Sequence, residues 1–157
     1  YTLRILSSFV ASYGFAMLFN SPPKVCTAAA VIGAIINTGR LASVDVAGMP
    51  VQAAVGLAAL AAGLLATVVA RRTHYSRVTL SVPAVVIMIP GVPLYRALAY
   101  LNDGQTSDAL ASLFTVLFTI TAIGVGLAVS RMLTDRNWLM ERPRGVPSLG
   151  PYARQPR

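Results

Sequence analysis

The residues with the most distinctive chemistry are Pro90-Gly91-Val92-Pro93, in the middle of a long apolar run. Neither proline has an N–H group, so a helix cannot pass through this stretch without a kink or a break. A new half-helix beginning at Pro93 would present free N–H groups and a partial positive charge. Transporters use such half-helices to hold a substrate's carboxylate, and Tyr95 and Arg96 would follow in the first turn. The pattern predicts either a carboxylate site at Pro90 and Gly91 or a proline kink that serves packing.

Arg40 is a second candidate for binding chemistry, because it follows Asn37 and Thr38 at the end of another apolar run. By helical rise it stands about 24 Å beyond Lys24, near the boundary of a bilayer's hydrocarbon core. Its side chain could extend outward to water. Alternatively, it faces inward with Asn37 and binds an anionic group through two parallel hydrogen bonds. The sequence leaves both interpretations open.

Catalytic sets are missing from the sequence. It contains no His-Glu-x-x-His helix, no Gly-x-Ser-x-Gly elbow and no phosphate-binding loop. One cysteine, Cys26, and one histidine, His74, cannot build a metal cluster. The sequence therefore predicts that the chain is not an enzyme and has no catalytic residue, no metal site and no cofactor.

The elements that position these candidates are defined by where the charges stand. The 13 Lys and Arg residues and 5 Asp and Glu residues lie at the edges of long charge-free windows. These windows are residues 5–23, 25–39, 46–70, 78–95 and 109–130. Only 11% of the chain is charged, whereas a soluble domain is about a quarter charged. The pattern argues against a soluble enzyme and, despite the net charge of +8, against a nucleic-acid binder. It indicates a polytopic membrane protein.

We predict an all-α, polytopic transmembrane helix bundle of five spans. The spans are expected at about residues 2–19, 25–43, 51–70, 78–101 and 109–130, with the fourth interrupted at Pro90-Gly91. Residues 1–130 would form the membrane unit. Residues 131–157 are rich in Arg and Pro and predict an extended cytoplasmic tail.

The distribution of basic residues predicts the orientation of the spans. Ten of them fall on one side: Lys24, Arg71, Arg72, Arg77, Arg131, Arg136, Arg142, Arg144, Arg154 and Arg157. The other side has three, Arg4, Arg40 and Arg96. The positive-inside rule then places the N-terminus outside and the C-terminus inside. Because almost all basic residues are Arg, a bias typical of GC-rich bacteria, we expect a bacterial cytoplasmic (inner) membrane.

Small residues recur at helical spacing along three of the predicted spans, which is typical of close helix packing in membranes. These stripes are Ala29, Gly33 and Asn37; Gly56, Ala59, Gly63, Ala66 and Ala70; and Ser112, Thr115, Thr119, Ala122 and Gly126. We interpret them as packing seams. The alternative is that Thr115 and Thr119 line a polar cavity.

Three motifs resemble a known family. The stretch from Gly14 to Pro22 resembles the end of the first span in the C-terminal-half unit of the threonine/serine exporter family. Residues 33–40 resemble its second span, and residues 85–95, an apolar run into Pro-Gly and then Tyr, resemble its most distinctive motif. The sequence departs from the pattern at Met88, where relatives often have another proline. The resemblance covers about residues 1–130.

The resemblance implies one half of a ten-span secondary exporter of small hydroxy amino acids such as threonine and serine. The partners expected are membrane lipids, a second five-span half (a separate chain or a fused N-terminal part) and a small carboxylate substrate. No nucleic acid is expected, and an oligomer is left open. The candidate substrate-binding residues are Pro90, Gly91, Tyr95, Arg96, Arg40 and Asn37.

Two alternatives stay open at this point. Some relatives are linked to dicarboxylates, so the chain could be half of a succinate-like exporter, for which two arginines would be suitable. It could also be a non-transporting accessory subunit of a membrane complex. The packing seams and the absence of Asp and Glu from the spans favour the accessory role.

Overall fold

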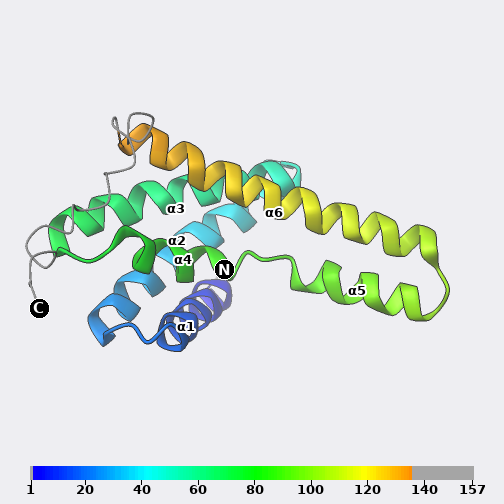
Figure 1. Ribbon diagram of the computed structural model, residues 1–157, viewed down its shortest axis with the longest axis horizontal. Helices are drawn as coiled ribbons and strands as arrows, with labels where there is room; N and C mark the ends of the chain where they lie inside the picture. The colour runs from blue at the N-terminus through cyan, green and yellow to red at the C-terminus, as the bar shows by residue number, and fades with distance from the viewer. Residues whose placement is uncertain (1, 136–157) are drawn as a thin grey trace, which may run out of the picture.

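The computed structural model describes residues 2–135, and these form an all-α molecule. The six helices, shown in Figure 1, are α1 (Thr2–Leu18), α2 (Pro23–Asp45), α3 (Val51–Thr73), α4 (Arg77–Val86), α5 (Gly91–Asn102) and α6 (Thr106–Thr134). Helix α6 continues beyond the predicted end of the fifth span at residue 130 and includes the first residues assigned to the tail. The rest of the predicted tail, residues 136–157, lies outside the described residues.

Three of the helices, α2, α3 and α6, are each long and apolar enough to cross a membrane. Helices α4 and α5 make a fourth candidate if they are one span bent by 48° at the break. Helix α1 is apolar but shorter, with 17 residues. The all-α architecture is therefore confirmed, and the helix is broken just before Gly91, whereas the count of five spans, with α4 and α5 as the fourth, stays a prediction.

Prolines determine where the fourth span breaks. Helix α4 ends at Val86 because Pro90 has no N–H to donate to the carbonyl of Val86. Helix α5 then begins at Gly91, with Pro90 as its N-cap, and not at Pro93 as the sequence analysis expected. Tyr95 and Arg96 consequently lie in the second turn of α5 rather than the first. Figure 1 shows α4 inside the bundle and α5 outside it.

A core of small and branched side chains holds α4 against α2 and α3. Its buried members include Leu80, Ala84 and Met88 from α4 and its end, packed with Ile32 of α2 and Ala62 of α3. Helix α4 also carries the buried Pro83 in its interior, a second proline that removes one helical hydrogen bond. Met88, where relatives of the resembled family often have proline, fills this core.

Helices α3 and α6 run parallel through a seam of small residues, as the stripes predicted. A Cβ added to Gly126 would lie 2.3 Å from the carbonyl oxygen of Gly56 and 3.0 Å from Ala59 Cβ. A Cβ added to Gly63 would lie 2.1 Å from Ser130 Oγ. Only glycine permits these approaches. The interpretation of these glycines as packing residues is confirmed.

The seam also determines how far α6 extends past its neighbours. Gly63 contacts Ser130 and Gly126 contacts Ala59, so residues in contact are offset by 67 positions. Val51, the first residue of α3, is therefore level with Phe118. Residues 106–117 of α6 continue about 18 Å past that level. They pair with α5 as a helical hairpin that projects from the bundle (Figure 1).

Candidate functional site

A chain of polar side chains links α1 to the C-terminal half of α2. Arg40 Nε donates a hydrogen bond to Asn37 Oδ1 at 3.0 Å. Asn37 Nδ2 in turn donates to Ser8 Oγ on α1 at 2.8 Å. The spacing of three residues places Asn37 and Arg40 on one face of α2. Ser8 thus fixes the amide of Asn37, and Asn37 fixes the guanidinium of Arg40.

Arg40 borders a pocket of about 300 Å³ between α2 and α3. Most of its lining is apolar, and Ser43 is the other polar side chain. The lining residues are Ile35, Ile36, Gly39, Arg40, Ser43, Ala54, Leu57, Ala58 and Ala61. Its lining, mainly apolar with one cation and few polar groups, has the composition of a small-molecule site, but the pocket is shallow and open on one side.

The half-buried guanidinium of Arg40 has no acidic partner among residues 2–135. Its only hydrogen bond in this part of the chain is the one to Asn37. The nearby carboxylate of Asp45 forms an ion pair with Arg4 of α1. A partly buried cation is costly unless a counter-charge is present, so this arrangement favours an anionic ligand.

The break before α5 offers backbone N–H groups rather than a charged side chain. The N–H of Gly91 bonds to the carbonyl of Ile89 at 2.8 Å, and the N–H of Leu94 bonds to the carbonyl of Pro90 at 3.2 Å. Pro93 has no N–H, so among the first four residues of α5 only Val92 keeps an unpaired backbone donor in the described structure. The half-helix therefore offers one donor rather than several.

The six residues predicted for the site fall into two groups. Asn37 and Arg40 lie on α2 inside the bundle, joined by their hydrogen bond. Pro90, Gly91, Tyr95 and Arg96 lie at the break and on α5, which packs against α6. Tyr95 is 73% exposed and Arg96 is also exposed. No hydrogen bond or ion pair joins the two groups among residues 2–135.

The structure clarifies the roles of three polar side chains, Ser8, Thr115 and Thr119. Ser8 received no role in the sequence analysis, although Ser8, Ser12 and Ala16 recur every four residues along α1 and are all buried. Conversely, the hydroxyls of Thr115 and Thr119 donate to carbonyls of their own helix, at 3.0 and 2.7 Å. This favours packing over a polar cavity on α6. Four-residue spacing was the available signal for Ser8.

Comparisons with known proteins agree with this architecture. A family model described as Threonine/Serine exporter, ThrE, matches residues 4–133. An uncharacterised protein of Haemophilus influenzae is 27% identical over 140 residues, which cover 84% of this chain and 47% of that protein. The chain thus spans about half the length of this relative. No solved structure matches the present chain. Since the family model covers most of the chain, this multi-pass membrane protein belongs to the threonine/serine exporter family.

Proposed function

We propose that the chain is a membrane half-unit of a secondary transporter that exports small hydroxy amino acids, threonine or serine. The observation that carries the proposal is Arg40, a half-buried cation beside a 300 Å³ pocket with no acidic partner in the described residues. Its terminal nitrogens would hold the substrate's carboxylate, while Asn37 and Ser8 hold the guanidinium in place. Together with the family match to exporters, this favours transport over an accessory role.

The break near Pro90 contributes the opposite side of the proposed site. Pro90 and Gly91 connect α4, which packs against α2 and α3, to α5, which packs against α6. The free N–H of Val92, with Tyr95 and Arg96 one turn further, adds polar groups on that side. In many transporters broken spans of this kind form the substrate site, around which two packed bodies move relative to each other. A movement at the break would bring these groups towards or away from Arg40.

The remaining parts of the site would come from a second half. The pocket lining contains no Asp or Glu that could receive the substrate's ammonium group. The relative of about twice the length has room for such a half. We expect five spans in this unit, residues 1–130, with the N-terminus outside and the cytoplasmic tail inside a bacterial inner membrane.

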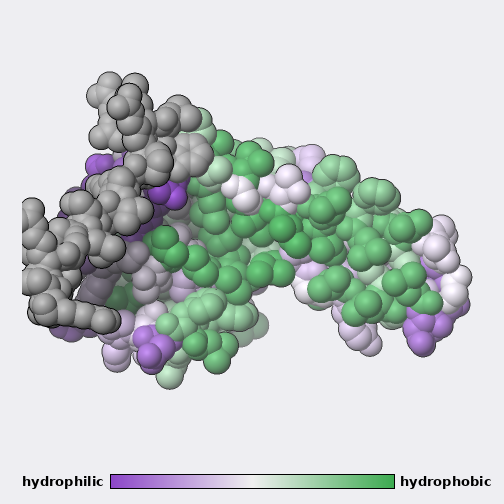
Figure 2. All heavy atoms as spheres, viewed as in Figure 1, coloured by the Kyte–Doolittle hydropathy of each residue, from purple (hydrophilic) through white to green (hydrophobic). Residues whose placement is uncertain are grey.

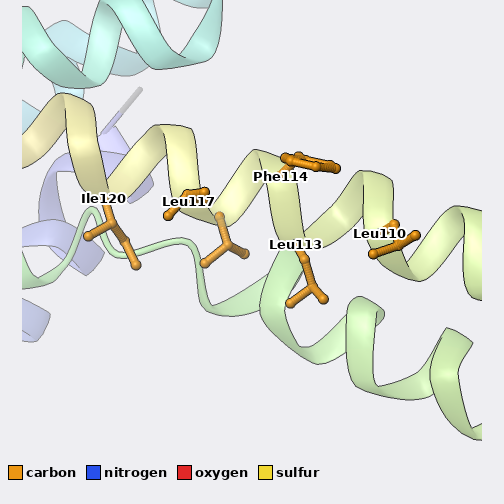
Figure 3. Close-up of a pocket in the computed structure, with 6 residues that line it drawn as sticks. Leu110, Leu113, Phe114, Leu117 and Ile120 are labelled. Atoms are coloured by element: carbon orange, nitrogen blue, oxygen red, sulfur yellow. The ribbon is translucent and has the colours of Figure 1, made fainter.

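The hairpin of α5 and residues 106–117 of α6 is the surface we assign to that second half. Helix α5 and the first residues of α6 belong to the fourth and fifth predicted spans, so we expect the hairpin to lie in the membrane. On the face seen in Figure 2 it is apolar apart from its tip, although α5 also carries the exposed Arg96. Helix α6 has a hollow of about 330 Å³ here, lined by Leu110, Leu113, Phe114, Val116, Leu117 and Ile120 (Figure 3). We assign this apolar surface to contact with the second half.

A dicarboxylate is the second candidate substrate. The specific observation is the same lack of an acid in the pocket, because a dicarboxylate has no ammonium group to be received. Arg40 would hold one carboxylate, and Arg96 or a residue of the second half would hold the other. This candidate differs from the first only in what the second half supplies.

Efflux of labelled threonine from cells that express the chain with its second half tests the proposal. Arg40→Ala should lower efflux at least tenfold, because a charge-assisted pair contributes about 1.5–3 kcal/mol. Arg40→Lys should recover only part of it, since lysine does not form the paired contact. Arg4→Ala, which removes a cation from the adjacent helix, is the matched control. Equal protein in the membrane for all variants is required.

Two outcomes would contradict this assignment. If Arg40→Ala exports threonine at the wild-type rate, Arg40 does not bind the substrate. If excess succinate suppresses threonine efflux while excess serine does not, a dicarboxylate replaces threonine and serine as the proposed substrate.

A further inference from the structure

A groove separates α4 from α6 and has two chemically different ends. At one end it is lined by Arg77, Val78, Ser81, Val82, Leu127, Arg131 and Asp135, around a volume of about 370 Å³. It continues into a second volume of about 270 Å³ lined by Val82, Val85, Val86, Ile89, Ile120, Ile123 and Leu127. Val82 and Leu127 line both volumes, so they form one groove. One end is charged and the rest is hydrocarbon.

The charged end is cationic overall. Arg77, Arg131 and Asp135 are the charged residues that line it in the described part of the chain, and Arg71 lies close by on α3, where it donates to the carbonyl of Thr134 at 3.3 Å. Arg77 is oriented by donating to Ser130 Oγ at 2.7 Å. Among residues 2–135, this end of the groove therefore brings together three arginines and one aspartate. An anionic group is the complementary ligand.

The apolar part excludes the amino-acid substrate, and the whole groove is about as long as one leaflet is thick. Every side chain that lines it is Val, Leu or Ile, so a zwitterion would lose its hydration there without any compensating hydrogen bond. From Arg131 to Ile120 the groove follows α6 for about 16 Å. One leaflet of the hydrocarbon core is about 15 Å thick.

We propose that this groove binds an anionic phospholipid, with the phosphate at Arg77 and Arg131 and one acyl chain lying between α4 and α6 towards Ile89 and Ile120. The lipid would fill the space between α4 and α6 up to the break at Pro90. The site does not depend on the proposed substrate, because it uses none of the residues assigned to the substrate, although its apolar part ends next to the break at Pro90. A failure here leaves the export proposal untouched, and the reverse also holds.

Native mass spectrometry of the full chain, released from detergent with phosphatidylglycerol or phosphatidylcholine of identical acyl chains, tests the site. We expect the anionic lipid to be retained at least fivefold better, since a basic residue near the surface contributes about that factor. Arg77→Gln with Arg131→Gln should abolish the preference. Arg96→Gln, which removes an exposed cation at the other end of the molecule, should keep it.

A second variant tests the apolar part of the groove independently of its arginines. Ile123→Trp should fill the apolar part and reduce retention of both lipids, whether or not the arginine variant folds. Millimolar inorganic phosphate should not displace the bound lipid, because the acyl chain contributes most of the binding. Equal retention of both lipids by the wild type, or displacement by phosphate alone, would overturn the proposal. Unchanged retention in Ile123→Trp would do the same.

Discussion

Two helix pairs in this molecule use the same contact, a serine hydroxyl packed against a glycine. Only one of the two hydroxyls forms hydrogen bonds among residues 2–135. In the α1/α2 pair, a Cβ at Gly33 would lie 2.0 Å from Ser12 Oγ. In the α3/α6 pair, a Cβ at Gly63 would lie 2.1 Å from Ser130 Oγ. Ser130 accepts from Arg77 and donates to the carbonyl of Leu127 at 2.8 Å. Ser12 Oγ is buried without a partner among residues 2–135.

The difference separates two ways of joining membrane helices. The α3/α6 pair combines close backbone contact with a hydrogen bond that also reaches α4 through Arg77. The α1/α2 pair relies on packing and leaves a polar atom unsatisfied, which costs free energy when no water is available. Disturbing the α3/α6 pair should therefore cost more than disturbing the α1/α2 pair. The α1/α2 pair is also the one that carries Ser8, Asn37 and Arg40.

Gly126→Ala should have the largest effect on stability. The new Cβ would lie 2.3 Å from the carbonyl oxygen of Gly56, a backbone atom that cannot move unless the helices separate. We expect a loss of about 3 kcal/mol, the upper range for overpacking, in reversible unfolding in mixed micelles. Gly124→Ala is the matched control, because a Cβ there meets nothing within 4 Å. Equal losses for the two variants would show that the α3/α6 contact is not this close.

The alanine variants of the two serine-facing glycines should follow in size and differ from each other. Gly63→Ala displaces Ser130 and with it the hydrogen bond from Arg77, so it should cost about 2 kcal/mol. Gly33→Ala displaces Ser12, which has no hydrogen bond to lose, and should cost about 1 kcal/mol. The same unfolding measurement applies. A greater loss for Gly33→Ala would reverse the comparison.

The sequence predicts the parts of this architecture that depend on local chemistry. Charges at the edges of apolar windows locate the helices to within a few residues, and the missing N–H of Pro90 locates the break. Small residues four apart identify Gly56, Gly63 and Gly126 as packing positions. Each of these signals lies within a single helix, so no knowledge of its neighbours is needed.

The relation between helices was not predictable in the same way. The hydrogen bond between Asn37 and Ser8 joins residues 29 positions apart, and the offset of α6 along α3 determines that a hairpin projects at all. The half-helix was expected to begin at Pro93 with several free N–H groups, but it begins at Gly91, and the carbonyls of Ile89 and Pro90 accept from the N–H groups of Gly91 and Leu94. Such competition for donors depends on the exact course of the chain through the break.

The smallest effects should come from the two serines themselves, and they test the comparison most directly. Ser130→Ala removes the acceptor of Arg77 and should cost about 1 kcal/mol. Ser12→Ala removes a buried hydroxyl that has no partner, so it should cost nothing or stabilise the protein by a few tenths of a kcal/mol. Both changes delete one oxygen from a fully buried side chain, so each controls for the volume change of the other. If Ser12→Ala were as costly as Ser130→Ala, the hydroxyl of Ser12 would have a partner, and the α1/α2 pair would be held in the same way as α3/α6.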